Sequence, residues 1–167
     1  FDQSSEKSAI ADKVETMFHD KKHRQDELRR RYFLYRWEVC TKYCKRIRKG
    51  LAALPPLPVS DDVSRVDHVI PTRTEVSVRA HRPVDATGEL SCIYWIHGGG
   101  MVVGSNVNDD PRFDGWCPRL NCAAVSVEYG LAPEHVYPKP LEDCYAGLRW
   151  VYENADVLGI DPTKIGI

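Results

Sequence analysis

The sequence predicts an α/β protein built on a mostly parallel sheet, with an antiparallel N-terminal edge and a helical segment before it. Two observations carry this prediction. In the second half of the chain, continuous apolar runs of strand length alternate with a helical pattern, which is typical of parallel strands buried on both faces. Before them, two short segments of alternating polarity flank Pro71 and indicate an antiparallel pair at a sheet edge.

The chain is predicted to be helical from about Glu6 to Gly50, because this stretch has no proline and no other glycine. Between Lys21 and Lys49 there are twelve Lys or Arg and three Asp or Glu, a local charge of +9 in a chain of net charge −1. The spacing predicts a basic amphipathic helix with one apolar stripe. This stripe consists of Phe33, Trp37, Cys40, Cys44, Ile47 and Leu51.

A proline-rich linker follows the helix, because Gly50 fits a helix cap and the prolines after it exclude further helix. We therefore expect a helical cap segment at 1–53, a linker at 54–65 and the amino-terminal part of an α/β domain at 66–167. The expected elements of that domain are strands at 66–70 and 74–79, a loop at 83–88, a strand at 92–96, a helix, a strand at 123–129, a helix at about 141–155, a turn at 161–163 and a last strand from 165.

Composition is that of a soluble globular domain, with 43 % hydrophobic and 28 % charged residues. No run reaches the roughly 18 uncharged apolar residues of a membrane-spanning helix, and the start lacks an apolar signal core, so a cytoplasmic location is the default expectation. The six cysteines form no CxxC pair and are interpreted as free core thiols. Nothing resembles a nucleic-acid reading motif, so nucleic acid is not an expected partner.

A glycine run directly follows the apolar strand at 92–96: His97, Gly98, Gly99 and Gly100. Glycines there can adopt positive φ and bring N–H groups close to a ligand, because no Cβ stands in the way. Such N–H groups can stabilise the oxyanion of an acyl-transfer reaction, each by about 2.7–4 kcal/mol. An isolated glycine triplet is more often a flexible turn, and the residues alone leave both interpretations open.

Several ordered motifs in this chain resemble the hormone-sensitive-lipase family of α/β-hydrolases. They are YWIHGGGMVVGS at 94–105, EYGLAPEH at 128–135, Pro138, the acidic pair Glu142 and Asp143, and the turn at Asp161 and Pro162. The resemblance runs from about Val66 to Ile167. It implies an α/β-hydrolase sheet and hydrolysis of small-molecule carboxylic esters through a serine nucleophile. The basic helix lies where the family has its cap helices.

In that family the HGGG segment is the oxyanion loop. The resemblance therefore implies N–H donation by Gly99 and Gly100, a turn-shaping role for Gly98 and a bracing hydrogen bond from His97. The family's catalytic base lies far downstream, so His97 is not expected to exchange protons with the substrate. Tyr129 is expected to pack close to the site.

The second motif implies a structural loop in which Glu134 is a hydrogen-bonding anchor. The sequence departs from the family at Gly130, where a long basic side chain is usual, and at Met101, where an aromatic residue is common. We expect the first departure to loosen the loop and the second to alter the floor of the acyl pocket.

No serine in this chain stands in Gly-x-Ser-x-Gly, the strand-to-helix elbow that exposes the family's nucleophile. The family's elbow follows a strand like the last one here, and its acid and base come later still. The sequence therefore predicts a hydrolase fragment that supplies the oxyanion loop, has no residue of the catalytic triad and is inactive by itself. The first residue, Phe1, and the alternating run at 164–167 also suggest a fragment. An apolar strand without a neighbour predicts poor solubility.

Other interpretations stay open at this point, and no metal or organic cofactor is implied. His19 and His23 have the spacing of metal ligands beside Asp20, but we interpret them as a solvated face because no third ligand accompanies them. The apolar stripe either packs on the core as a lid over the acyl pocket or lies on an anionic lipid surface. The parent protein is either an esterase or a non-catalytic ligand-binding homologue, as the plant gibberellin receptor is among relatives of this fold.

Overall fold

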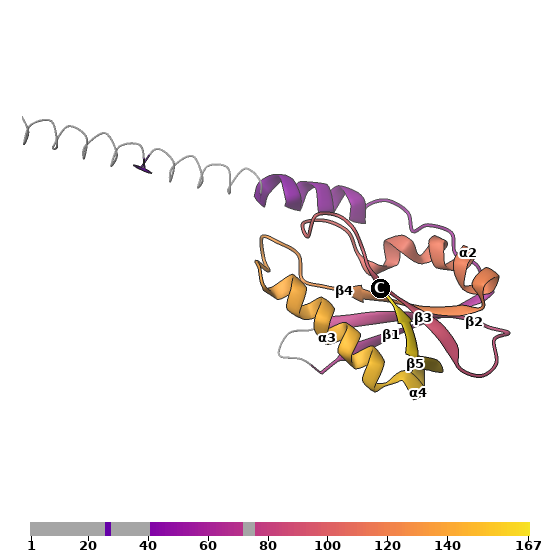
Figure 1. Ribbon diagram of the computed structural model, residues 1–167. Helices are drawn as coiled ribbons and strands as arrows, with labels where there is room; N and C mark the ends of the chain where they lie inside the picture. The colour runs from indigo at the N-terminus through magenta and orange to yellow at the C-terminus, as the bar shows by residue number, and fades with distance from the viewer. Residues whose placement is uncertain (1–25, 28–40, 72–75) are drawn as a thin grey trace, which may run out of the picture. The chain divides into compact units, whose positions relative to one another are not determined.

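The computed structural model describes residues 26–27, 41–71 and 76–167. The chain divides into two compact units, residues 1–46 and 47–167, and the second contains a five-stranded sheet with helices (Figure 1). The elements are β1 Val63–Ile70, β2 Val76–Pro83, β3 Leu90–Ile96, the 3-10 helix η1 Asn106–Asp109, α2 Asp110–Leu120, β4 Cys122–Glu128, α3 Lys139–Glu153, α4 Ala155–Leu158 and β5 Ile160–Gly166.

The strands lie in the order β1-β2-β4-β3-β5. β2 pairs antiparallel with β1 and β4, whereas β3 pairs parallel with β4 and β5. The predicted α/β sheet with an antiparallel edge at its start is therefore confirmed. β4 shows why the pattern was informative, because six of its seven residues are buried, as expected for a strand covered on both faces.

Helices cover both faces of this sheet (Figure 1). α2 packs Phe113 and Cys117 against Ala124 of β4. α3 packs Val151 into a separate cluster that contains Val125 of the same strand. Neighbouring residues of β4 thus point to opposite faces, as the alternation of a strand requires, and the two helical layers bury them both.

The expected linker at 54–65 is shorter in the structure. β1 begins at Val63, because Val63 pairs with Pro83 and Arg65 with His81 in an uninterrupted antiparallel register. Proline content correctly excluded helix here, but it gave no information on where pairing with the next strand begins.

Two other boundaries also differ from expectation. The turn expected at 161–163 lies inside β5, where the Asp161 side chain accepts the Thr163 N–H at 2.9 Å and the pairing with β3 is irregular between Leu90 and Cys92. α3 begins at Lys139, because Pro140 occupies the first turn, where a missing N–H costs nothing.

Residues 41–52 are helical. Of the predicted stripe, Cys44 is half-buried, and Ile47 and Leu51 expose 49 % and 46 % of their surface. None of the helices in the described ranges combines the length and hydropathy needed to cross a bilayer. The other residues of the stripe and the proposed histidine pair lie outside the described residues: Phe33, Trp37, Cys40, His19, Asp20 and His23.

Candidate active site

Two loops meet at one edge of the sheet. We call residues 97–105 the glycine loop and residues 129–138 the proline loop. β3 and β4 are parallel neighbours, so their carboxyl ends lie at the same edge, and each loop directly follows one of these strands. Ligands of open α/β sheets bind at this edge, and the sequence-predicted site residues are brought together there.

The backbone of the glycine loop turns sharply after Gly98. Gly99, Gly100 and Met101 have φ values of +121°, +62° and +61°. A Cβ on Gly99 would lie 1.9 Å from the Val103 carbonyl oxygen, whereas a Cβ on Gly98 would meet no atom within 4 Å. Gly99 is thus the position in this turn where both the space and the φ value require glycine, and the turn-shaping role expected of Gly98 stays a prediction.

The N–H groups of this turn are available to an acceptor. Gly98, Gly99 and Gly100 are exposed, and within the described loops no backbone hydrogen bond has one of their N–H groups as donor. The turn is closed instead through the Gly99 carbonyl, which accepts the N–H groups of Val102 and Val103 at 3.1 Å each.

His97 is buried beneath the glycine loop and its ring stacks on Tyr129, with centroids 4.3 Å apart. Nδ1 of His97 lies 2.8 Å from the Gly98 carbonyl oxygen, and the Tyr129 hydroxyl donates to the His97 carbonyl at 2.8 Å. Burial raises the pKa of Tyr129, so its hydroxyl stays a donor at neutral pH. A Cβ on Gly104 would lie 2.5 Å from the His97 ring. His97 is therefore in close contact with Gly98, Gly104 and Tyr129.

The proline loop is held at Gly130, where the departure from the family predicted a looser segment. The Gly130 N–H donates to buried Asp143 at 3.0 Å, and Lys139 forms an ion pair with the same carboxylate. A Cβ on Gly130 would lie 2.7 Å from the His135 ring, which fills the space a side chain would need. The loop is therefore packed and hydrogen-bonded at this position.

The two loops are joined to each other and to Arg48. The Ala132 N–H donates to the Met101 carbonyl at 2.8 Å. Arg48 donates to the Val102 carbonyl at 2.6 Å and pairs with Glu134 at 2.8 Å. Sequence reasoning missed Arg48, because it is one of twelve basic residues between 21 and 49 and nothing local distinguishes it.

The exit of the glycine loop is fixed by β4. The Asn106 N–H, at the start of η1, donates to the Glu128 carboxylate at 2.7 Å. The Ser126 hydroxyl, which is buried in the sheet, donates to the Asn106 carbonyl at 3.4 Å. Both ends of the glycine loop are thus tied to the sheet, which limits where its N–H groups can point.

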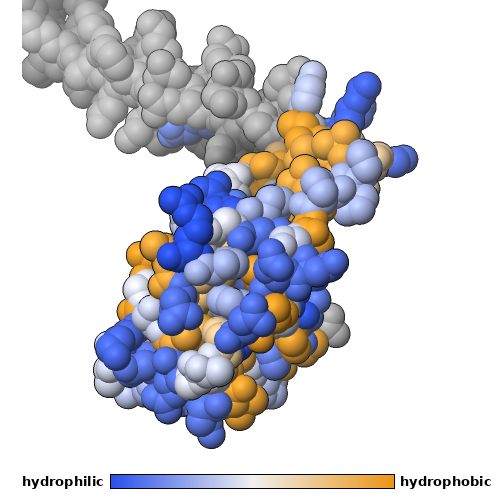
Figure 2. All heavy atoms as spheres, turned by 90° about the vertical axis from the view of Figure 1, so that its right-hand side faces the viewer, coloured by the Kyte–Doolittle hydropathy of each residue, from blue (hydrophilic) through white to orange (hydrophobic). Residues whose placement is uncertain are grey.

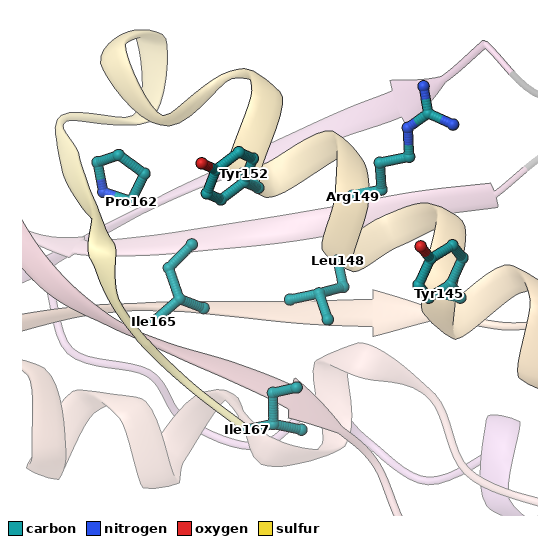
Figure 3. Close-up of a pocket in the computed structure, with 7 residues that line it drawn as sticks. All are labelled: Tyr145, Leu148, Arg149, Tyr152, Pro162, Ile165 and Ile167. Carbon is teal, nitrogen blue, oxygen red and sulfur yellow. The ribbon is translucent and has the colours of Figure 1, made fainter.

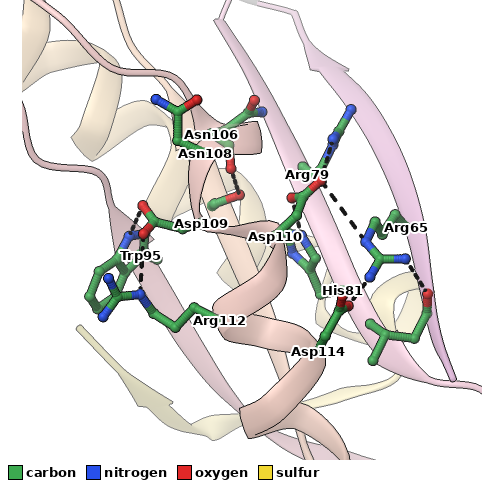
Figure 4. A network of polar contacts seen from close by, with 12 residues as sticks. Arg65, Arg79, His81, Trp95, Asn106, Asn108, Asp109, Asp110, Arg112 and Asp114 are labelled. Atoms are coloured by element: carbon green, nitrogen blue, oxygen red, sulfur yellow. Dashed lines mark hydrogen bonds and ion pairs between the residues drawn. The ribbon is translucent and has the colours of Figure 1, made fainter. Parts of the chain in front are cut away.

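An ion network follows at the start of α2 (Figure 4). Asp110 accepts hydrogen bonds from His81 Nε2 and Arg79 Nη1 of β2, both at 2.8 Å. Burial alone would raise the pKa of Asp110, but the hydrogen bonds and charges of these two partners outweigh it and lower that pKa below its usual value. Alternation in β2 did not identify these residues, since a buried His and a half-buried Arg have the same sequence pattern as the polar face of an exposed strand.

A separate groove of about 380 Å³ lies between α3 and β5 (Figure 3). No residue of the glycine loop lines it, so we do not assign it to the candidate site. It is lined by Tyr145, Leu148, Arg149, Tyr152, Pro162, Ile165 and Ile167. In the described part of the chain, no three His, Cys, Asp or Glu side chains are arranged to hold a metal ion.

Comparison with known proteins gives the same family as the motifs. Residues 93–167 match the family model for the alpha/beta hydrolase fold. The chain is 33 % identical over 130 residues to carboxylesterase NlhH of Mycobacterium tuberculosis, covering 78 % of this chain and 40 % of NlhH. It is 33 % identical over 84 residues to hormone-sensitive lipase of Mus musculus, covering 50 % of this chain and 11 % of the lipase.

Comparison with solved structures gives the same result. A bacterial heroin esterase matches with a TM-score of 0.60 and 36 % identity, covering 75 % of this chain and 39 % of the esterase. The chain thus spans less than half the length of each of these relatives. The fold is that of the α/β-hydrolases, and the motifs and matches make this chain similar to esterases and lipases of the hormone-sensitive-lipase type.

Proposed function

We propose that this chain supplies the oxyanion loop of a serine carboxylic-ester hydrolase, with Gly99 and Gly100 as the N–H donors. The observation that carries the proposal is a pair of exposed glycines at the carboxyl end of a parallel strand, whose N–H groups donate no backbone hydrogen bond within the described residues. The carboxylesterase and esterase relatives support the class of reaction. The substrate class that follows is a small ester with an acyl chain.

The reaction needs these donors at one step. When a serine hydroxyl oxygen attacks the ester carbonyl carbon, the C=O electron pair moves onto the carbonyl oxygen, and a base takes the hydroxyl proton. N–H groups at Gly99 and Gly100 would stabilise that oxyanion, each by about 2.7–4 kcal/mol. Donors held in place before the reaction cost no reorganisation, and the contacts of His97 and Tyr129 supply such a hold.

The 167 residues contain no Gly-x-Ser-x-Gly segment, so we propose that the serine, its acid and its base are contributed by other residues of the parent protein. By this mechanism the 167-residue polypeptide alone does not hydrolyse esters. Turnover of p-nitrophenyl butyrate by the purified 167-residue chain, above a heat-treated sample, would contradict this part of the proposal.

The donors are tested in the full-length parent protein with Gly99→Ala and its matched control Gly98→Ala. Gly99→Ala forces a Cβ against the Val103 carbonyl, whereas Gly98→Ala enters open space. We expect Gly99→Ala to lower kcat/KM for p-nitrophenyl butyrate by about 10²-fold or more, and Gly98→Ala to change it little. Equal effects of the two substitutions would refute the assignment. Binding of an ester analogue without hydrolysis by the parent protein would favour a ligand-binding homologue.

A second candidate function is contact with an anionic lipid surface. Ile47, Leu51 and Leu54 expose 49 %, 46 % and 63 % of their surface on a segment that also carries Lys49. Figure 2 shows hydrophobic groups lying open on the surface among hydrophilic ones. Such a surface suits insertion at a lipid interface better than a stripe packed on the core as a lid. We expect the chain to sediment with phosphatidylglycerol vesicles, less so at high salt, and not with phosphatidylcholine vesicles. Equal binding to both vesicle types would refute it.

A further inference from the structure

We propose that Arg48 is a positioning residue, which fixes the glycine loop against the proline loop and so sets the orientation of the oxyanion donors. This inference rests on the proposed function for its significance, but the contact itself can be tested without turnover. Arg48 lies outside every motif that carries the family resemblance.

The three guanidinium nitrogens of Arg48 each have a different acceptor. Nε donates to the Val102 carbonyl at 2.6 Å, Nη1 pairs with a Glu134 carboxylate oxygen at 2.8 Å, and Nη2 donates to the Ala132 carbonyl. Val102 belongs to the glycine loop and the other two acceptors to the proline loop. A planar guanidinium presents its donors at fixed angles, so it can hold three acceptors in one arrangement.

The acceptors of Arg48 lie close to the proposed donors along the chain. Val102 is two residues after Gly100, and its own N–H closes the turn by donating to the Gly99 carbonyl at 3.1 Å. The next carbonyl toward Gly100, that of Met101, is already held by the Ala132 N–H at 2.8 Å. Consecutive carbonyls after the turn are therefore fixed by the proline loop and by Arg48, which restricts rotation of the peptide groups before them.

The hydrogen bonds of Arg48 are strengthened because its side chain is largely buried. The Arg48 side chain is 25 % exposed, so its hydrogen bonds are shielded from water. Its neighbour Lys49 is exposed and has no hydrogen bond or ion pair within the described residues. The two residues thus form a matched pair in which, among the described residues, only Arg48 has hydrogen bonds to the loops.

The test is hydrogen–deuterium exchange of the 167-residue chain, comparing Arg48→Met, Arg48→Lys and the control Lys49→Met. The reporters are the protected N–H groups of Val102, Val103 and Ala132. We expect Arg48→Met to speed their exchange about tenfold, equal to about 1.4 kcal/mol. Arg48→Lys should give a smaller effect, because one ammonium can keep the pair with Glu134 but cannot span three acceptors. Lys49→Met should leave exchange unchanged.

Unchanged exchange at the three reporters in Arg48→Met would overturn the proposal. So would an equal rise in β3, β4 and α3, because that result describes a general loss of stability. Since the readout contains no chemistry, an inactive parent protein would refute the proposed function and leave this inference standing, whereas unchanged exchange would refute only the inference.

Discussion

Replacing Asp110 with Asn tests whether the ion network holds α2, and with it the exit of the glycine loop, against the sheet. Asp110 is 5 % exposed and accepts from His81 and Arg79. Arg79 also has two hydrogen bonds from its guanidinium to Asp67, but His81 is fully buried. Asn keeps one acceptor oxygen and loses the charge, so one of the two donors loses its partner.

We expect Asp110→Asn to lower the free energy of unfolding by about 3 kcal/mol. Removing one partner of a buried ion pair costs about 3–5 kcal/mol, and the lower end applies because Asp67 still neutralises Arg79. For a domain of this size, such a loss lowers Tm by roughly 10 °C. Urea denaturation followed by tryptophan fluorescence measures it, because Trp95 and Trp116 pack at α2.

Acid unfolding provides an independent signature. The pKa of Asp110 is lowered in the folded state, so its stabilisation is fully present above the unfolded-state value of about 4 and is lost as pH falls through the folded value. The wild type should therefore lose stability on acidification below about pH 4. Asp110→Asn should lose less over that range, with the remaining slope partly due to Asp67, whose pKa is also lowered.

The matched control is Glu153→Gln, which removes an exposed ion pair with Arg149. We expect it to change the free energy of unfolding by no more than about 0.5 kcal/mol. The reasoning is refuted if Asp110→Asn is as stable as this control, or if its stability falls with acid as steeply as that of the wild type.

Two further predictions concern the core. Gly147→Ala places a Cβ 2.4 Å from the Tyr94 hydroxyl and should lower the free energy of unfolding by about 1–3 kcal/mol. Gly115→Ala is the control: its Cβ meets no atom within 4 Å, so the free energy of unfolding should stay the same or rise, and thermal unfolding compares the two variants. Burial raises the pKa of the Cys92 thiol to about 12. Iodoacetamide added to the native chain at pH 8 should therefore label half-buried Cys44 before Cys92, as read by mass spectrometry, and faster labelling of Cys92 would contradict the packing.

Sequence patterns predicted the sheet well because each strand leaves a local trace. The burial of β4 and the alternation before Pro71 depend on neighbouring positions only. The resemblance then located the two loops, since each follows a strand whose end was predicted within one residue, at 96 and 128.

What sequence could not predict are contacts between distant segments. Arg48 and Glu134 are 86 positions apart, and Asp110 lies 31 from Arg79. The local sequence does not indicate such a pair, because the partner of a charged side chain is determined by the fold and not by the residues next to it in the sequence. The sequence also did not distinguish Gly98 from Gly99, because the clash that a Cβ on Gly99 would have involves the Val103 carbonyl, whose position is known only from the folded turn.

The backbone conformation of Met101 shows why the contacts that fix the glycine loop matter. It is not glycine, yet its φ is +61°, a left-handed conformation that costs about 1–2 kcal/mol. Strained backbone persists only where its surroundings over-determine it. Here the Met101 carbonyl accepts the Ala132 N–H, and the following carbonyl accepts from Arg48. Within the described residues, the Gly99 and Gly100 N–H groups donate no backbone hydrogen bond, and the strained turn that presents them is held by the contacts of Met101 with Ala132 and of Val102 with Arg48.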